Sequence, residues 1–255
     1  MSEKTYQNTI SSRLYLNQEK EKITNSLSNK SIQEFQQALS QNPKVPDQEK
    51  SKKDVVFIAT TGGFDGRGQD KTSEVQNYSG TEKIYNKVHD IVNKENKNFK
   101  GQFIDPGVTC SSTIETAKKH ITKNHDMGDK LIIYGYSNGA RCSIDLAHSL
   151  QKDGVKVDEL ITVDATDRHF RNYTLNTSIP SNVESHHNYY QRGSCGTIKC
   201  SRGEEHTAND PTTTISNTKI TSDQIKNLEH RKYPHRYMEA IVESNVLNNI
   251  TSSLK

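Results

Sequence analysis

The fold is decided by Leu131-Ile132-Ile133-Tyr134-Gly135-Tyr136-Ser137-Asn138-Gly139-Ala140, where an apolar run leads directly into Gly-x-Ser-x-Gly. This pattern is typical of a buried strand that turns sharply into a helix, with a serine strained at the turn. Gly135 and Gly139 leave the space that such a turn needs. At ordinary Gly and Ser frequencies of roughly 7 %, a chain of this length contains on the order of 0.1 such matches by chance. The motif predicts a nucleophile elbow if its neighbours also alternate between strand and helix.

The segments ahead of the motif alternate in this way. Residues 55–59 form a short apolar run, as a buried parallel strand requires. Apolar residues at helical spacing follow over 80–93, and residues 102–104 read as a second strand. Ser111 or Ser112 can cap the helix that comes next.

The segments behind the motif continue the alternation. We expect a helix from Asn138 to about Gln151, a strand over 160–163, a possible strand over 183–190 and a last helix over about 237–250. Residues 168–217 otherwise look polar and loop-like. The order predicts an α/β fold, with a mostly parallel sheet flanked by helices on both faces, in one domain over residues 54–255.

Residues 1–53 differ in composition from the rest of the chain. They are rich in Gln, Asn, Ser, Lys and Glu, and Pro43 and Pro46 precede a charged run typical of a linker. We interpret this part as a polar, partly helical N-terminal extension. A docking or export segment is the alternative.

Composition excludes several classes of protein. Only 30 % of the 255 residues are hydrophobic, and the net charge is +3. That charge is too mild and too evenly spread to predict nucleic-acid binding. No run approaches the length of a transmembrane helix, and the N-terminus lacks a Sec signal peptide. We therefore expect a protein that is cytoplasmic, or exported without a Sec signal. Its oligomeric state is left open.

The cysteines and histidines do not predict a metal site. The spacing of the four cysteines fits neither a zinc ribbon nor a Cys-x-x-Cys redox motif. Cys195 and Cys200 are close enough in sequence to pair, but free thiols are the expected state in a cytosolic chain. His186, His187 and His206 lack a ligand spacing such as His-x-x-x-His. We expect no metal and no cofactor.

Catalytic partners for Ser137 follow from the chain order Ser, Asp, His. Asp164 ends the strand over 160–163, where the acid of such a triad belongs, and Asp167 is the alternative. His235 lies just ahead of the last expected helix and is preferred to His230. The expected triad is thus Ser137, Asp164 and His235.

A glycine-rich loop follows the first strand at residues 60–68. Its spacing matches neither a dinucleotide-binding loop nor a P-loop, so phosphate binding is disfavoured. A plain loop is one alternative, and a backbone N–H donor for an oxyanion hole is the one that we prefer. The expected donors are the N–H of Asn138, just after the nucleophile, and an N–H near Thr61.

With these residues in place, the chain resembles an α/β-hydrolase and is similar to bacterial lipase and esterase-like proteins over about residues 54–250. The resemblance implies a serine hydrolase of a small-molecule or lipid ester or thioester, and some members of this broad class are lipase effectors delivered by secretion systems. Two features depart from lipases: Ala59-Thr60 stands where His-Gly is usual, and no apolar lid is evident. A catalytically silent scaffold that acts as a binding module is the alternative, and acyl transfer to an acceptor other than water uses the same triad.

Overall fold

The computed structural model describes residues 53–62, 80–106, 110–166, 175–192, 203–224 and 234–255. The expected N-terminal extension, except for Lys53, lies outside the described residues, and so does most of the glycine-rich loop. The domain boundary at residue 54 therefore stays a prediction.

The first half of the described chain alternates strictly between strand and helix. Its elements are β1 (Asp54–Thr60), α3 (Gly80–Lys94), β2 (Asn98–Ile104), α4 (Cys110–Asn124), β3 (Lys130–Tyr136), α5 (Asn138–Lys152) and β4 (Val157–Val163). The alternation that the sequence predicts is confirmed here. One detail is wrong: α4 begins at Cys110, so Ser111 and Ser112 lie in its first turn and are not its caps.

The second half holds shorter strands and the last helix. Its elements are β5 (Ser178–Ile179), β6 (Val183–Tyr190), β7 (Thr207–Ala208), β8 (Thr214–Lys219), a 3-10 turn (Ser222–Gln224) and α7 (Pro234–Ser253). The loop-like interpretation of residues 168–217 misses β5, β7 and β8. Strand β8 escapes a periodicity argument because five of its six residues are polar and only Ile215 is apolar.

Six strands form one sheet in the order β2-β1-β3-β4-β6-β8. Every neighbouring pair is parallel; Ala59 pairs with Tyr134, for example, and Ile133 pairs with Leu160. In a parallel sheet all carboxyl ends lie at one edge, so the residues after β1, β3 and β4 meet there. The expected α/β fold class is confirmed.

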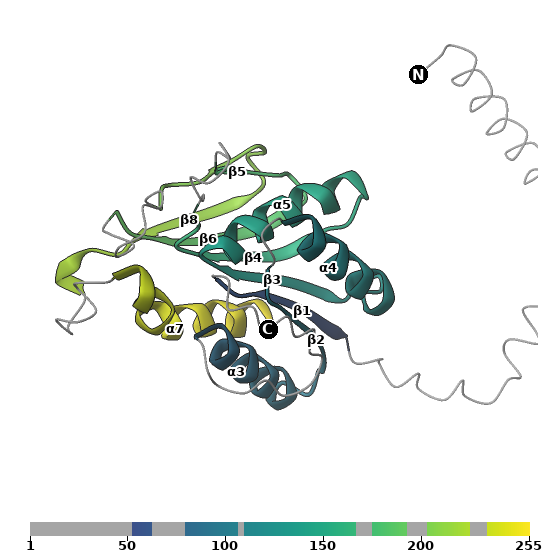
Figure 1. Ribbon diagram of the computed structural model, residues 1–255. Coiled ribbons are helices and arrows are strands. Elements are labelled where there is room, and N and C mark those ends of the chain that lie inside the picture. The colour runs from purple at the N-terminus through teal and green to yellow at the C-terminus, as the bar shows by residue number, and fades with distance from the viewer. Residues whose placement is uncertain (1–52, 63–79, 107–109, 167–174, 193–202, 225–233) are drawn as a thin grey trace, which may run out of the picture. The chain divides into compact units, whose positions relative to one another are not determined.

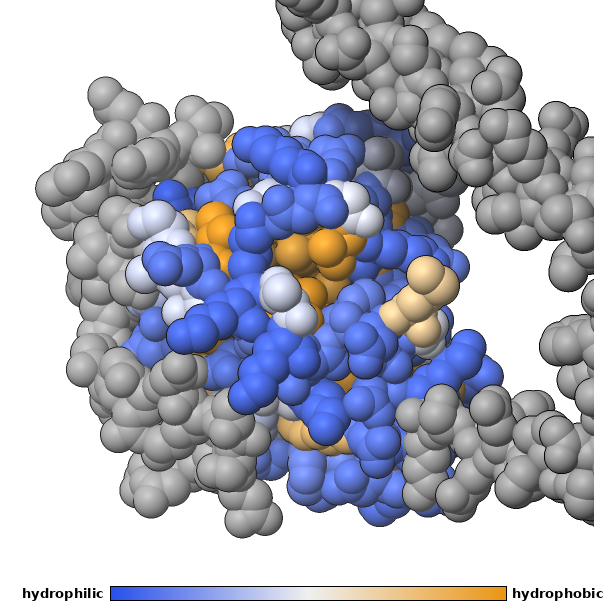
Figure 2. All heavy atoms as spheres, turned by 90° about the vertical axis from the view of Figure 1, so that its right-hand side faces the viewer, coloured by the Kyte–Doolittle hydropathy of each residue, from blue (hydrophilic) through white to orange (hydrophobic). Residues whose placement is uncertain are grey.

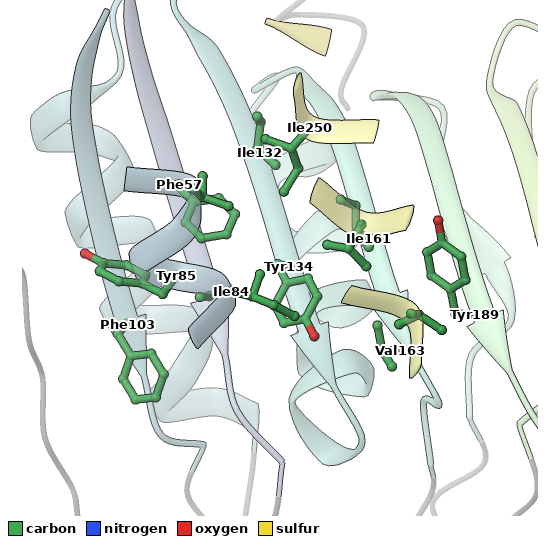
Figure 3. Close-up of a cluster of buried hydrophobic side chains, with 14 of the residues drawn as sticks. Phe57, Ile84, Tyr85, Phe103, Ile132, Tyr134, Ile161, Val163, Tyr189 and Ile250 are labelled. Carbon is green, nitrogen blue, oxygen red and sulfur yellow. The ribbon is translucent and has the colours of Figure 1, made fainter. Parts of the chain in front are cut away.

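Helices cover both faces of the sheet, with α3 and α7 on one face and α4 and α5 on the other (Figure 1). Successive residues of β1 show how this works: Phe57 packs on the α3 and α7 side, and Ile58 packs on the opposite side. Figure 3 shows the first of these cores, where Ile132, Tyr134 and Ile161 of the sheet lie among side chains of α3 and α7. Because both faces are buried, the central strands are apolar almost throughout.

The surface is strongly polar, in line with the mean hydropathy of −0.90. On the face in Figure 2, hydrophilic residues cover most of the described surface and leave a small apolar area near its centre. Among the described residues, Met127 is the exposed large hydrophobic side chain. No helix in the described ranges is both long enough and apolar enough to cross a membrane.

A disulfide joins Cys110 to Cys142, a pair that the spacing of the cysteines did not suggest. Helix α4 packs on α5 and brings the two Cα atoms to 5.0 Å, within the usual range for a disulfide. The sequence could not show this because the residues are 32 positions apart and meet only in the folded chain. Cys195 and Cys200 lie outside the described residues.

Candidate active site

Ser137 occupies a strained turn between β3 and α5. Its φ of 56° and ψ of −121° are rare for a residue with a side chain. A Cβ at Gly135 would lie 2.5 Å from Ser143 Oγ, and one at Gly139 would lie 2.3 Å from the carbonyl oxygen of Thr61. Both glycines of the motif are therefore required by close contacts around the turn. The expected nucleophile elbow has this geometry.

Neighbouring strands hold the turn in place. The Ser137 N–H donates to the carbonyl oxygen of Val163 at 2.9 Å. From the end of β1, Thr60 Oγ1 donates to the carbonyl oxygen of Gly139 at 2.9 Å and lies 2.7 Å from Ser143 Oγ. The strain at Ser137 is thus balanced by bonds to β1 and β4.

Asp164, His235 and Ser137 form a continuous chain of hydrogen bonds. His235 Nδ1 lies 2.6 Å from Asp164 Oδ2, and His235 Nε2 lies 2.9 Å from Ser137 Oγ. A carboxylate can only accept, so Nδ1 carries a proton and, in the neutral ring, Nε2 is the acceptor for the serine hydroxyl. The Asp164 side chain is fully buried, while 17 % of the His235 side chain is exposed.

Asp164 is held at the carboxyl end of β4 with a positive φ of 49°. Gln191, just after β6, donates from Nε2 to Asp164 Oδ2 at 2.8 Å and from its backbone N–H to Oδ1 at 3.3 Å. A Cβ at Gly203 would come within 2.7 Å of Asp164 Oδ1. Gln191 and the backbone at Gly203 therefore hold the Asp164 carboxylate in place independently of its bond to the imidazole.

Two further side chains contact the serine and the histidine. Tyr136 donates its hydroxyl to the backbone carbonyl of His235 at 2.6 Å, and the two rings stack with centroids 5.3 Å apart. Thr166 Oγ1 lies 3.3 Å from Ser137 Oγ. The residue just before the nucleophile thus fixes the histidine, and a second hydroxyl borders the nucleophile.

Backbone N–H groups near Ser137 determine where an oxyanion could bind. Asn138 is the first residue of α5, where N–H groups have no partner within the helix. The N–H of Thr61 donates to the carbonyl oxygen of Ile104 at 3.1 Å and is already used. A Cβ at Gly62 would lie 2.7 Å from Ser137 Cβ, so the backbone of Gly62 runs directly beside the nucleophile.

The structure brings together Ser137, Asp164 and His235, three residues that the chain order singles out. The alternatives Asp167 and His230 lie outside the described residues. His235 lies in the first turn of α7 and not on a loop ahead of it, because the helix begins at Pro234. Proline suits that position, where its missing N–H costs no helical bond.

The sequence did not single out Gln191, Tyr136 or Thr166 as residues of this site. A signal existed for Gln191, since it follows the expected strand over 183–190 and must therefore end at the same edge as Asp164. No signal in the sequence distinguishes Thr166 from any other threonine in a loop.

A metal centre finds no support in the described ranges, where no group of three or more His, Cys, Asp and Glu side chains is placed to hold an ion. His186 and His206 do meet: His186 Nε2 lies 2.8 Å from His206 Nδ1, and their rings stack with centroids 5.1 Å apart. This pair is buried and remote in sequence from the triad.

No protein-family model matches the sequence, and no curated protein matches it. Several solved structures are similar at low identity. The thioesterase domain SrfTE, described for cyclization of the lipopeptide antibiotic surfactin, is 12% identical, covering 76% of this chain and 92% of that chain with a TM-score of 0.36. Est1E from Butyrivibrio proteoclasticus is 11% identical over 80% of this chain and 90% of that one, with a TM-score of 0.39.

A putative cell surface hydrolase from Lactobacillus plantarum is 12% identical over 79% of this chain and 96% of that chain, with a TM-score of 0.39. The parallel sheet, the helices on both of its faces and the strained serine after β3 make this an α/β-hydrolase-like fold.

Proposed function

We propose that this protein is a serine hydrolase that cleaves an ester or thioester through Ser137, His235 and Asp164. One observation carries the proposal: Ser137 Oγ lies 2.9 Å from His235 Nε2, and His235 Nδ1 lies 2.6 Å from Asp164 Oδ2. These contacts are within hydrogen-bond reach, as a nucleophile and its general base require.

In this mechanism Ser137 Oγ attacks the acyl carbon while His235 Nε2 takes the hydroxyl proton. Asp164 holds the imidazole in the correct tautomer and stabilises the imidazolium that forms. His235 then returns the proton to the leaving oxygen or sulfur, which leaves an acyl group on Ser137. Water, deprotonated by the same imidazole, releases the acid and restores the serine.

The oxyanion of the tetrahedral intermediate needs two donors. We assign the N–H of Asn138, as the sequence suggests, and the N–H of Gly62 in place of that of Thr61, which is bonded to Ile104. Loss of one such donor typically raises the barrier by about 3 kcal/mol.

The rival interpretation is a silent scaffold that keeps the turn but has lost catalysis. It would be favoured if His235 pointed away from Ser137, and the 2.9 Å contact argues for the hydrolase. Acyl transfer to another acceptor would show as a product in which the acyl group is joined to an alcohol or amine.

The test combines active-site labelling with an ester panel. A fluorophosphonate should label folded wild-type protein at Ser137 and leave Ser137→Ala unlabelled. Ser149→Ala is the matched control, because Ser149 lies on α5, the helix that follows Ser137, but contacts Lys118 and not the triad. Absence of labelling in the folded wild type, while a control esterase is labelled, would contradict the proposal.

Substrate class follows from the same panel. Hydrolysis of phospholipid vesicles by the wild type and not by Ser137→Ala would indicate a phospholipase. Activity confined to short soluble esters or thioesters would indicate a general esterase or thioesterase.

A further inference from the structure

We propose that Glu239 is a positioning residue, which fixes the first turn of α7 so that the His235 imidazole reaches Ser137 and Asp164. The inference rests on the proposed function for its catalytic consequence, but the geometry of Glu239 stands apart from it. Glu239 lies four residues after His235, one helical turn further along the same face of α7.

Glu239 is a buried acid in the stripe of α7 that packs on the core. It is 7 % exposed and lies between the apolar contacts of Met238 and Val242. A charge in such a place is costly unless hydrogen bonds compensate it. A buried carboxylate therefore needs hydrogen-bond donors, and two other elements of the fold provide them.

The partners come from α3 and β3. Thr81 Oγ1 donates to Glu239 Oε1 at 2.5 Å, and the Tyr134 hydroxyl donates to the same oxygen at 2.8 Å. The backbone N–H of Thr81 also bonds the carboxylate. A Cβ at Gly80 would lie 2.5 Å from Glu239 Oε2, so only glycine there allows this approach. Glu239 thus caps the N-terminus of α3 from another helix, where a carboxylate is favourable.

This cluster matters because His235 lies at a helix end. The first turn of a helix has the fewest internal bonds and frays most easily. Two contacts oppose fraying: the Tyr136 hydroxyl on the carbonyl of His235, and Glu239 one turn later. Tyr134 and Tyr136 both belong to β3, which ends just before Ser137, and Figure 3 shows the Tyr134 side chain on the face that α7 covers. The strand that carries the nucleophile therefore also holds the helix that carries the base.

Glu239 also interacts electrostatically with the triad. Burial raises the pKa of Glu239 to about 7, against the bonds from Thr81 and Tyr134 and the charge of His235, which lower it. The titratable groups that face it are Tyr134 from β3 and His235 from its own helix, and α3 presents the uncharged Thr81. A positive charge on the imidazole one turn away favours the ionised form of the Glu239 carboxyl.

Glu243 offers a matched control. It lies one turn further along α7 and pairs with Lys87 of α3, so it also joins these two helices. Among the described residues Glu243 makes no hydrogen bond to β3, although its charge acts on the Tyr134 hydroxyl, and it is two turns from His235. Glu239→Ala and Glu243→Ala therefore remove the same atoms from the same helix pair, and only the first removes the link to the nucleophile strand.

For Glu239→Ala we expect kcat to fall by about 100-fold with KM nearly unchanged, since a misplacement of about 1 Å has effects of this size. Glu239→Gln keeps an oxygen for both hydroxyls and should recover most of this loss. Its kcat should depend less steeply on pH below 7, because the carboxyl no longer titrates alongside the triad. Glu243→Ala should stay within about twofold of wild type.

A second readout does not require turnover. The proton on His235 Nδ1, in its short bond to Asp164, should give a far-downfield ¹H NMR line that disappears in Glu239→Ala and persists in Glu243→Ala. If Glu239→Ala does not fold, Thr81→Ala keeps the charge and the bond to Tyr134, and should lower kcat by about 10-fold.

The outcomes separate the two proposals. A folded wild type without hydrolysis or fluorophosphonate labelling overturns the proposed function, and the NMR line still tests the role of Glu239. A folded Glu239→Ala that keeps the NMR line and labels as fast as Glu243→Ala overturns the positioning role. Equal losses in both variants assign Glu239 to general helix packing and overturn it as well.

Discussion

The half of the sheet around β3 and the half around β6 are buried by different physical means. Strand β3, in the half that carries the nucleophile, is Lys-Leu-Ile-Ile-Tyr-Gly-Tyr and is buried by apolar contacts on both faces. Strand β6, in the other half, is Val-Glu-Ser-His-His-Asn-Tyr-Tyr, and its His186 and Asn188 are as buried as any core residue. Burial in the second half therefore depends on hydrogen bonds.

A connected polar network fills the second half. His186 Nδ1 donates to the carbonyl oxygen of Leu160 at 3.0 Å, and its Nε2 accepts from His206. The side chain of Asn217 bonds both the N–H and the carbonyl of His206 at 2.9 Å. Asn188 joins the network through Asn217 at 2.8 Å. Such networks rigidify a core and are costly to disturb. Among the described residues, His206 Nε2 is the atom of this network that is buried without a partner.

The two halves of the sheet should therefore respond differently to pH. Apolar packing around β3 is insensitive to pH, whereas the β6 network needs two neutral imidazoles. Burial lowers the pKa of His206 to about 4, and burial together with the neighbouring His206 lowers the pKa of His186 well below its usual value. A loss of folding stability in acid should therefore come from the half around β6.

The largest effect is expected from Ser137→Ala, which removes the proposed nucleophile from the apolar half. We expect kcat to fall by about 10⁶-fold, as for nucleophiles in other serine hydrolases. The melting temperature should not fall, because the strained serine adds no core contact. Ester hydrolysis and calorimetry on the same sample check both parts, and residual activity near wild type would assign catalysis to another residue.

The next effect is acid sensitivity of the polar half. Unfolded histidine binds a proton near pH 6.5, but the folded pKa of His206 is about 4. The unfolded state therefore binds more protons as pH falls between these values, and folding stability is lost in that window. The loss from His206 is on the order of 3 kcal/mol.

The measurement must separate this loss from opposite contributions. Burial raises the pKa of both Glu159 and Glu239 to about 7, so these carboxyls favour the folded state as pH falls below 7. We compare urea unfolding of wild type with that of His186→Phe/His206→Phe from pH 7 to pH 4. The stability advantage of wild type should shrink with falling pH, and a constant difference would contradict the prediction. His89→Phe, at a partly exposed site on α3, is the control.

An effect on stability of similar size is expected for Gly139→Ala at the elbow. Its Cβ would lie 2.3 to 2.4 Å from carbonyl oxygens of Thr61 and Thr60, and backbone atoms cannot move aside cheaply. We expect a loss of about 3 kcal/mol in unfolding free energy. Gly154→Ala is the control for backbone strain alone, since Gly154 has a φ of 72° but open space around it, and it should cost about 1 kcal/mol. Equal losses would show that crowding at the elbow is unimportant.

The smallest effect is expected for Gln191→Leu, at the point where the halves meet. Gln191 follows β6 and holds the carboxylate of Asp164. Loss of the Nε2 donor should lower kcat by about 10-fold and leave KM unchanged, since about 1.4 kcal/mol is a typical worth for such a bond. Tyr190→Phe, which removes a neighbouring hydroxyl bonded to Glu205, should leave kcat unchanged. An unchanged kcat in Gln191→Leu would show that Asp164 is held by other contacts.

The same contrast explains what the sequence could predict. Apolar runs located β1, β3 and β4, because buried parallel strands must be apolar on both faces. Strand β8 was missed since five of its six residues are polar and most of them are exposed. The triad residues could be proposed from the chain order Ser, Asp, His, and Ser137 and Asp164 had to lie at the same edge of the sheet because the carboxyl ends of parallel strands meet there.

Contacts that depend on tertiary packing could not be predicted. Cys110 and Cys142 meet only when α4 lies on α5. Glu239 did leave a trace, as the acid within the apolar stripe of the last helix, but its partners on α3 and β3 follow no rule of spacing. The side chains that support the triad were therefore harder to find than the triad itself.

The disulfide gives the chain a covalent topology that its linear sequence does not have. Cys110 and Cys142 close a ring that contains all of α4, all of β3 and Ser137. A single protease cut between them leaves both fragments joined until a reductant is added. In the unfolded chain the same ring keeps the nucleophile strand near the start of α5, and ring closure of this size stabilises the fold by about 3 to 4 kcal/mol. The nucleophile elbow therefore folds from a segment whose two ends are already covalently joined.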